Sequence, residues 1–442
     1  MLNPAQIDLV YLLNKAWPII LANAAVPLLG LVDTAIIGNV GSIEELGAIA
    51  FGALIFSFVY WSFGFLRMGT TGFVAQAMGR GDEAEIRAAL GRALLLASGL
   101  AVVIILLQWP IARSVFLLLD GSTAVESVAQ DYFFVRIWGA PATLTTFALM
   151  GLLIGLGNSR QLLLVQLFLN GLNVLLDVWF AGALKMGATG IALGTVIAEW
   201  ITVLFAGFLV WRELEQRRLQ SEPFWDLGKI FDPRRLGKTL TANSDIMIRT
   251  LLMIFSFSFF MNQSARFGDA VLAANHILMQ MISFAAFFLD GYAFVVESIV
   301  GTSIGARRLD SFKRAVSLST LLAFATATML AMLIWVFGEN AVALLTDLGE
   351  VRQAAMKMLS LPAIYVLLSF AAFQLDGIFI GASCTRQMRH AAFISVSIFL
   401  VAWWLLIEPW GVIGLWWAMI VYVSARALAL LMFYGKLQAA FK

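Results

Sequence analysis

The chain has 442 residues, of which 61% are hydrophobic and 13% are charged, and its mean hydropathy is +0.90. An average soluble domain is about 25% charged, so the composition excludes an ordinary soluble globule and indicates that lipid surrounds most of the chain. A net charge of +2 gives no reason to expect a nucleic acid as partner. The single cysteine, Cys384, excludes a disulfide framework and a cysteine-only metal site.

Apolar runs long enough to cross a membrane follow one another along nearly the whole chain. A transmembrane helix needs about 20 mainly apolar residues, and long continuous runs favour helices over barrel strands. No small-residue cleavage pattern follows the first run, so it is predicted to be a span and not a removable signal peptide. The twelve predicted spans are 13–38, 46–73, 90–118, 131–156, 161–183, 187–211, 242–265, 270–299, 314–338, 353–382, 389–409 and 411–435.

Lysine and arginine indicate the orientation. With twelve spans, both termini and every even-to-odd connection lie on the same side of the membrane. That side, together with the span ends next to it, carries 20 of the 29 lysines and arginines, the opposite loops and span ends carry five, and four lie deeper within spans. Positive charge gathers on the cytoplasmic side, so both termini are predicted to be cytoplasmic.

One connection differs from the short loops elsewhere. Residues 212–240 are rich in charge and contain Pro223 and Pro233, which is typical of a linker. The predicted domains are therefore an N-lobe over residues 1–211, a cytoplasmic linker over 212–240 and a C-lobe over 241–442.

The two lobes resemble each other at a nearly constant offset. GLLIG at 151–155 matches GIFIG at 377–381, and Gly79 matches Gly305, each 226 residues apart. Six helices per half make the repeats parallel, and transporters built this way place their sites near the midplane and rock one half against the other. The predicted fold class is an all-α integral membrane protein with twelve transmembrane helices in two pseudo-symmetric six-helix lobes.

Carboxylates within spans are the main functional signal, because an acidic side chain at a helix centre costs about 2.5–3.5 kcal/mol to insert. Asp33 lies late in the first span. Asp177 lies in the fifth, one turn after Asn173, and Thr195 and Glu199 form a similar pair in the sixth. No basic residue lies within one turn of Asp33 or Asp177, which favours a functional role for both.

The second half carries acids of its own. Asp290 and Glu297 share a face of the eighth span, and Asp376 lies in the tenth. Together with Glu199 they are secondary candidates for the site, and none of the three has an acidic counterpart at the 226-residue offset. The alternative is structural: arginines within the spans neutralise some acids, and Asp245, one turn before Arg249, is expected to serve in such an ion pair.

A buried cluster of acids and neutral oxygens has two chemical uses. Burial and a like-charged neighbour favour the protonated form of a carboxyl group, so the cluster can load and release a proton. Carboxylate, amide and hydroxyl oxygens together also suit a hard cation. Both uses involve Asp33, Asn173, Asp177 and Thr195, and the sequence leaves H⁺ and Na⁺ open.

Two prolines make the first span a candidate switch. Pro18 and Pro27 each remove a backbone hydrogen bond and permit a kink in the span that carries Asp33. The alternative is that proline merely bends a membrane helix without a role in switching.

Six motifs follow one another along the chain: AWPIILANAAVPLLGLVDTAIIGNVG (16–41), FLRMGTTGFVAQAMGRGD (65–82), NVLLDVWF (173–180), GATGIALGTVIAE (187–199), NSDIMIRTLL (243–252) and LDGYAFVVESIVGTSIGAR (289–307). In this order they resemble the multidrug and toxic compound extrusion (MATE) family, and within it the bacterial DinF branch. The resemblance covers essentially the whole chain.

This resemblance implies cation-driven efflux of small amphiphilic or cationic drugs from a multi-pass protein of the bacterial inner membrane. It implies that Asp33 is the central protonation site, with Asn173, Asp177 and Thr195 around it, and that Pro18 bends with protonation. H⁺ is the preferred coupling ion, with Na⁺ at the same four side chains as the alternative. No other metal or cofactor is expected, and the expected partners are the drug and membrane lipid around a monomer.

The predicted function is a cation/drug antiporter that works by alternating access, in which a proton on Asp33 drives release of the drug. The alternative is a flippase for lipid-linked precursors, which shares the two-lobe plan and is expected to have a more basic cavity for pyrophosphate. An enzyme is disfavoured, because the chain has two histidines, His276 and His390, and no HExxH, GxSxG or Walker-type motif.

Overall fold

The structure is a computed structural model that describes residues 4–117, 122–218, 222–439 and 441. Within these ranges the regular secondary structure is entirely helical, as the long apolar runs predict. Backbone groups in hydrocarbon must satisfy one another's hydrogen bonds, and a helix does so within a single segment.

Contacts divide the chain into two compact units. The N-terminal unit consists of Leu21–Val74 and Asp82–Leu240, and the C-terminal unit consists of Met1–Ile20, Ala75–Gly81 and Thr241–Lys442. The predicted division into N-lobe, linker and C-lobe stays a prediction. The two units are defined by contacts and not by sequence order, and they group Met1–Ile20 and Ala75–Gly81 with the second half.

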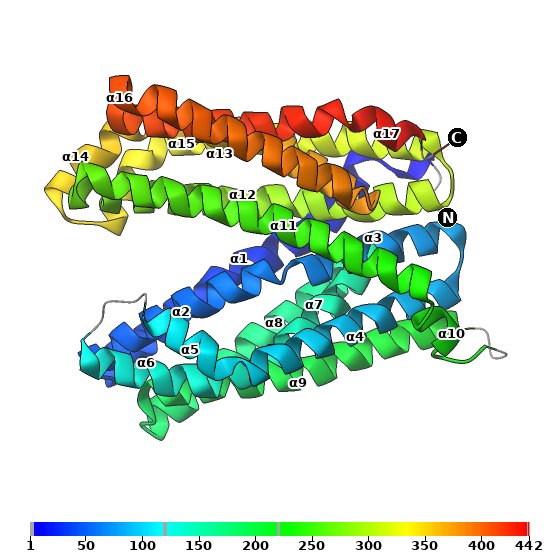
Figure 1. Cartoon of the computed structure of the whole chain (residues 1–442), viewed down its shortest axis with the longest axis horizontal. Helices are drawn as coiled ribbons and strands as arrows, with labels where there is room; N and C mark the ends of the chain where they lie inside the picture. Colours follow the sequence, from blue (N-terminus) through cyan, green and yellow to red (C-terminus); the bar gives the residue numbers. More distant parts are fainter. Residues whose placement is uncertain (1–3, 118–121, 219–221, 440, 442) are drawn as a thin grey trace. The chain divides into compact units, whose positions relative to one another are not determined.

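The N-terminal unit is a bundle whose helices run side by side (Figure 1). A polar cap begins α2: the Ser42 hydroxyl accepts a hydrogen bond from the amide of Glu45, and the Glu45 carboxylate accepts one from the amide of Ser42. Its elements are residues 21–40 of α1 (Leu9–Val40), then α2 (Ile43–Ser62), α3 (Phe65–Arg80) up to Val74, α4 (Glu83–Leu106), α5 (Gln108–Phe116), α6 (Thr123–Arg136), η2 (Ile137–Gly139), α7 (Ala140–Gly155), α8 (Ser159–Asp177), the π-helix η3 (Val178–Ala183), α9 (Gly187–Arg217), α10 (Leu227–Ile230) and the start of α11.

The C-terminal unit is a second helical bundle, in which α12 packs against both α13 and α15. Besides the beginning of α1 and the end of α3, its elements are η1 (Pro4–Gln6), α11 (Pro233–Ser264) from Thr241, η4 (Ala265–Phe267), α12 (Asp269–Gly305), α13 (Leu309–Leu345), α14 (Gly349–Met358), α15 (Ser360–Gly381), α16 (Thr385–Met432) and α17 (Tyr434–Ala439).

Eleven helical segments of the described residues are long and apolar enough to cross a membrane. One of them, α16, has 48 residues and would extend about 72 Å as a single helix, more than twice the thickness of the hydrocarbon core. Gly411 interrupts it with φ 55° and ψ −131°, and Gly414 lies against the backbone of Leu406 across the interruption. Split at Gly411, α16 supplies two spans, which confirms the predicted fold of twelve helices.

Glycine contacts repeat in the two halves at the predicted offset. Gly151 on α7 lies against the backbone of Arg67 on α3, and Gly377 on α15 lies in the same way against Ala293 on α12. Both partners are 226 residues apart, like the glycines themselves. Small residues let membrane helices approach closely, so the matching sequences GLLIG and GIFIG mark a packing interaction that both halves use.

The ends of α3 and α12 pack against each other through two equivalent glycine contacts. Gly79 lies against the carbonyl group of Thr302. Gly305 lies against the carbonyl group of Gln76. Adding 226 to Gly79 gives Gly305, and subtracting 226 from Thr302 gives Gln76. The two contacts are therefore equivalent, as in a self-complementary interface on a two-fold axis. Both contacts lie within the C-terminal unit, to which Ala75–Gly81 belongs.

Gly79→Ala and Gly305→Ala should destabilise the protein by similar amounts, about 1–3 kcal/mol, because each new methyl group meets a backbone carbonyl that cannot rotate away. The measurement is the midpoint of thermal unfolding of the purified protein in detergent. Gly207→Ala is the control, since Gly207 has open space around it in α9 and alanine favours a helix. Variants with widely different midpoints would contradict the two-fold contact.

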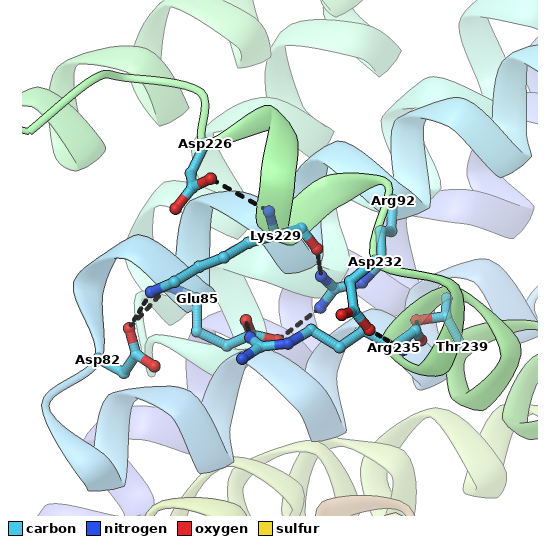
Figure 2. Close-up of polar contacts among 8 residues, drawn as sticks. All are labelled: Asp82, Glu85, Arg92, Asp226, Lys229, Asp232, Arg235 and Thr239. Carbon is cyan, nitrogen blue, oxygen red and sulfur yellow. Dashed lines mark hydrogen bonds and ion pairs between the residues drawn. The ribbon is translucent and has the colours of Figure 1, made fainter.

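Glu85 on α4 holds the linker in place through two arginines (Figure 2). Its carboxylate accepts hydrogen bonds from Arg92 at 2.6 Å and from Arg235 at the start of α11. Arg92 also donates to the carbonyl oxygen of Lys229 in α10 at 2.8 Å. Glu85 and Arg92 are 8% and 2% exposed, so solvent screens these interactions little.

Further contacts fix the same segment. Asp82 pairs with Lys229 at 3.3 Å, and the buried side chain of Ile230 packs directly on Gly91 of α4, which leaves no room for a side chain there. Of the predicted linker 212–240, the first part continues α9 and the last part begins α11. The charge pattern predicts a linker, and its contacts make it a docked part of the N-terminal unit.

Glu85→Gln should release the linker from α4, because loss of one partner from a buried ion pair costs about 3–5 kcal/mol. We expect amide hydrogen exchange over residues 222–240 to accelerate at least about tenfold, which corresponds to about 1.4 kcal/mol. Glu215→Gln is the matched control: Glu215 pairs with Arg218 at a more exposed position, where solvent weakens an ion pair. Equal exchange in the two variants would show that Glu85 does not hold the linker.

Candidate ion-binding cluster

Two carboxyl groups, for which the described residues provide no basic hydrogen-bond partner, face each other in the N-terminal unit. Asp177 is the last residue of α8 and is fully buried, and Asp33 on α1 is half-buried. The two groups are near enough to share a proton. Within the described part of the chain, no donor reaches either oxygen of Asp177 or the Oδ1 atom of Asp33. Two like charges in such a place are unfavourable unless a proton or a cation accompanies them.

Neutral oxygen atoms of Asn173 and Thr195 lie beside Asp177. Asn173, one turn before Asp177, donates from Nδ2 to Oγ1 of Thr195 at 3.0 Å. The Thr195 hydroxyl in turn donates to the carbonyl oxygen of Ile191 at 2.9 Å. This arrangement leaves the Oδ1 atom of Asn173 buried and without a donor among the described residues. It can therefore serve as a ligand for a cation or as an acceptor from a protonated carboxyl group.

Two backbone features that the sequence does not predict position Asp177. Gly194 on α9 lies directly against the Oδ1 atom of Asp177, so any larger residue at that position would displace the carboxylate. The π-helix η3 begins immediately after Asp177, and such wide turns frequently occur at functional sites. The spacing of Gly190 and Gly194 in GATGIALG is the signal for the first feature, because small residues four apart permit close helix packing.

Glu199 does not share the unpaired state that Asp177 has among the described residues, because it forms an ion pair with an arginine. Arg136 on α6 binds it through two parallel hydrogen bonds, Nη2 to Oε1 at 2.6 Å and Nη1 to Oε2 at 2.8 Å. Both residues are buried, and the guanidinium group also stacks over the rings of Phe56 and Tyr60. Glu199 thus serves as the counter-ion of Arg136, whose remaining electrostatic influence reaches Asp33 and Asp177.

The acids of the second half occupy different environments. Glu297 is buried on α12 and Asp290 is half-buried on the same helix. Asp376 on α15 forms ion pairs with Arg249 and Arg426. Asp245 pairs with Arg389, at 2.7 Å, and not with the nearby Arg249. These four acids all lie in the C-terminal unit, whereas Asp33 and Asp177 lie in the N-terminal unit.

The structure describes the side chain of only one of the two prolines of α1. Pro18 is buried and belongs to the C-terminal unit. Pro27 lies in the helical backbone of α1, but its side chain is outside the described residues. The predicted switch in this helix stays a prediction.

Comparison with known proteins identifies the family. The MatE family model matches residues 18–179 and 246–405, which is one match in each half. This chain belongs to the MatE family. DNA damage-inducible protein F of Escherichia coli K12 is 36% identical over 424 residues, covering 94% of this chain and 90% of that protein. The multidrug resistance protein NorM of Vibrio cholerae is 24% identical, covering 95% of this chain and 93% of NorM. The resemblance to the DinF branch is thereby confirmed.

Solved MatE-family structures share the fold. An outward-facing multidrug resistance MATE family transporter superposes with a TM-score of 0.84 at 18% identity, covering 97% of this chain and 96% of the other. A transporter from Pyrococcus furiosus gives 0.86 at 18% identity, over 98% and 96%. The predicted all-helical transporter fold is therefore confirmed, while the roles of single residues follow from the chemistry of this chain.

Proposed function

We propose that this chain is a secondary multidrug exporter that exchanges H⁺ for drug by alternating access, with the proton carried by the cluster of Asp33, Asn173, Asp177 and Thr195. The main support is the juxtaposition of Asp33 and Asp177, which are close together and have no donor to the oxygens named above among the described residues. The multidrug resistance protein named among its relatives supports the cargo class.

The chemistry of the cluster supplies a switch. When both carboxyl groups are ionised they repel each other across a medium of low dielectric, and one shared proton removes that repulsion. Loading and loss of the proton thus favour different separations of α1 and α8. A ligand changes a conformational equilibrium only through its different affinity for the two states, and the proton has such a difference here.

The available driving force is sufficient for export. One proton that crosses about 100 mV yields about 2.3 kcal/mol, and one unit of pH adds about 1.4 kcal/mol. Together they sustain a drug gradient of several hundredfold, since each factor of ten requires about 1.4 kcal/mol. Na⁺ at the same oxygens is the alternative coupling ion.

The remaining features of the proposal follow from the charge pattern and the family. We place the protein in the bacterial inner membrane with both termini in the cytoplasm, because the inferred cytoplasmic side carries most of the lysines and arginines. It acts as a monomer, and it moves its cargo without chemical change. The flippase alternative needs several positive charges for a pyrophosphate, whereas Arg136 is neutralised by Glu199 and two further arginines share Asp376.

Asp33→Asn should abolish drug resistance in a host that lacks its own efflux pumps, because asparagine cannot exchange a proton, and Asp177→Asn should act in the same way. The measurement is the inhibitory concentration of several drugs at equal membrane expression. Asp347→Asn is the control, since Asp347 is an exposed acid that pairs with Arg352. Unchanged resistance with Asp33→Asn would remove this residue from the mechanism.

Proteoliposomes that contain the purified protein should transport drug when a pH gradient is imposed. A Na⁺ gradient of the same size should have little effect. The Asp33→Asn protein in matched vesicles provides the background rate. Transport that depends on Na⁺ alone would retain the cluster and replace the coupling ion, whereas transport independent of both gradients would contradict the antiport.

A further inference from the structure

A buried cluster of charged side chains with a net positive charge lies within the C-terminal unit. It consists of Arg249 on α11, Asp376 on α15 and Arg426 on the second half of α16, each 7–8% exposed. Arg249 and Arg426 both donate to the same oxygen, Oδ2 of Asp376, the second at 2.6 Å. Three residues from three helices thus carry two positive charges and one negative charge.

The cluster has an unused donor. The Nη1 atom of Arg249 is buried and has no hydrogen-bond partner in the part of the chain that the structure describes. Arginine is always protonated in proteins, so the three side chains retain one net positive charge. An uncompensated buried charge is strongly unfavourable. Asp245, one turn before Arg249, is itself paired with Arg389.

Arg249 lines a pocket in the C-terminal unit. Its charged wall is the cluster itself, and its remaining walls include Met253, Met388 and Leu430, with Tyr422 stacked under Arg426. The space inside the pocket that a water-sized sphere can enter is about 10 Å³, which is room for about one water molecule. A larger group therefore enters only when the side chains that line the pocket move. Flexible methionine side chains adapt to ligands of varied shape, so the site combines one positive charge with a deformable apolar lining.

We propose that this pocket binds one singly charged anionic group, which accepts hydrogen bonds from the Arg249 and Arg426 guanidinium groups while Asp376 acts as their built-in counter-ion. A carboxylate or sulfonate matches the planar fork of arginine. A monovalent group completes the charge balance, whereas a pyrophosphate would carry an excess of negative charge and a cation would meet a net repulsion.

The anionic group can belong to a small free anion or to an amphiphile whose tail lies along the methionine side of the pocket. As a cargo site, the pocket rests on the proposed export function and extends it to anionic amphiphiles. As a binding site, it stands independently of transport. The test therefore measures binding first and transport afterwards.

Binding is measured by calorimetry on the full chain purified in an uncharged detergent. The probes are decanoate, decyltrimethylammonium as its cationic counterpart of equal tail length, and chloride or acetate as free anions. We expect decanoate to bind more tightly than decyltrimethylammonium. A free anion that competes with decanoate identifies the small anion as sufficient, and a lack of competition shows that the tail contributes to the same site.

Three variants change the charge of the cluster in opposite directions. Arg249→Gln leaves a neutral pair of Arg426 and Asp376, so the protein still folds around a compensated acid, and decanoate affinity should fall at least about tenfold. Arg426→Gln should act in the same way. Asp376→Asn raises the net charge to two and should tighten decanoate binding. Arg352→Gln, which removes an exposed arginine paired with Asp347, is the control and should leave the affinity unchanged.

A purely structural ion triad would respond differently: all three cluster variants would lower thermal stability, and none would change the affinity for decanoate selectively. That result would overturn the proposal, as would tighter binding of the cationic probe that is lost in Asp376→Asn. If the affinities change as expected but vesicles show no gradient-driven transport of any drug, the anion site stands and the proposed export function fails.

Discussion

A charged group inside a membrane protein is stable only when a partner of opposite sign accompanies it, and this requirement organises the polar residues of this chain. Arg136 with Glu199 and Asp245 with Arg389 meet it through internal pairs. Two clusters do not meet it. Asp33 and Asp177 together carry excess negative charge, and the triad around Asp376 carries excess positive charge. We propose that a partner from outside the chain restores the balance at each of them.

The two imbalances have opposite signs and lie in different units of the chain. The first suits a proton or a small cation held by oxygen atoms, and the second suits an anionic group held by guanidinium nitrogens. Under the two proposals, the coupling ion and an anionic group bind at separate sites. Because the second half does not repeat the acids of the first at the 226-residue offset, each half has acquired its own polar chemistry on a shared backbone.

That shared backbone depends on glycines at which helices touch. The contacts of Gly151 and Gly377 are equivalent in the two halves, and the contacts of Gly79 and Gly305 are two-fold related. In lipid, helices gain little from apolar burial against each other and associate through close van der Waals packing. At these positions glycine therefore holds the helices together by permitting close packing, as a large apolar residue holds the core of a soluble protein together by its burial.

The sequence alone determined the number of spans, the repeat and the positions of acids within spans, because hydropathy, periodicity and residue spacing are local properties. The resemblance to the MATE family grouped Asn173 and Thr195 around Asp33, and the hydrogen bond between these two side chains is a finding of the structure. Only the tertiary structure decided which acids have arginine partners. Arg136 and Glu199 are 63 residues apart, and Arg249 and Asp376 are 127 apart, so no local pattern distinguishes a neutralised acid from an unneutralised one. The docking of the linker and the room that Gly194 leaves for Asp177 are likewise consequences of helix packing, which depends on contacts between distant segments.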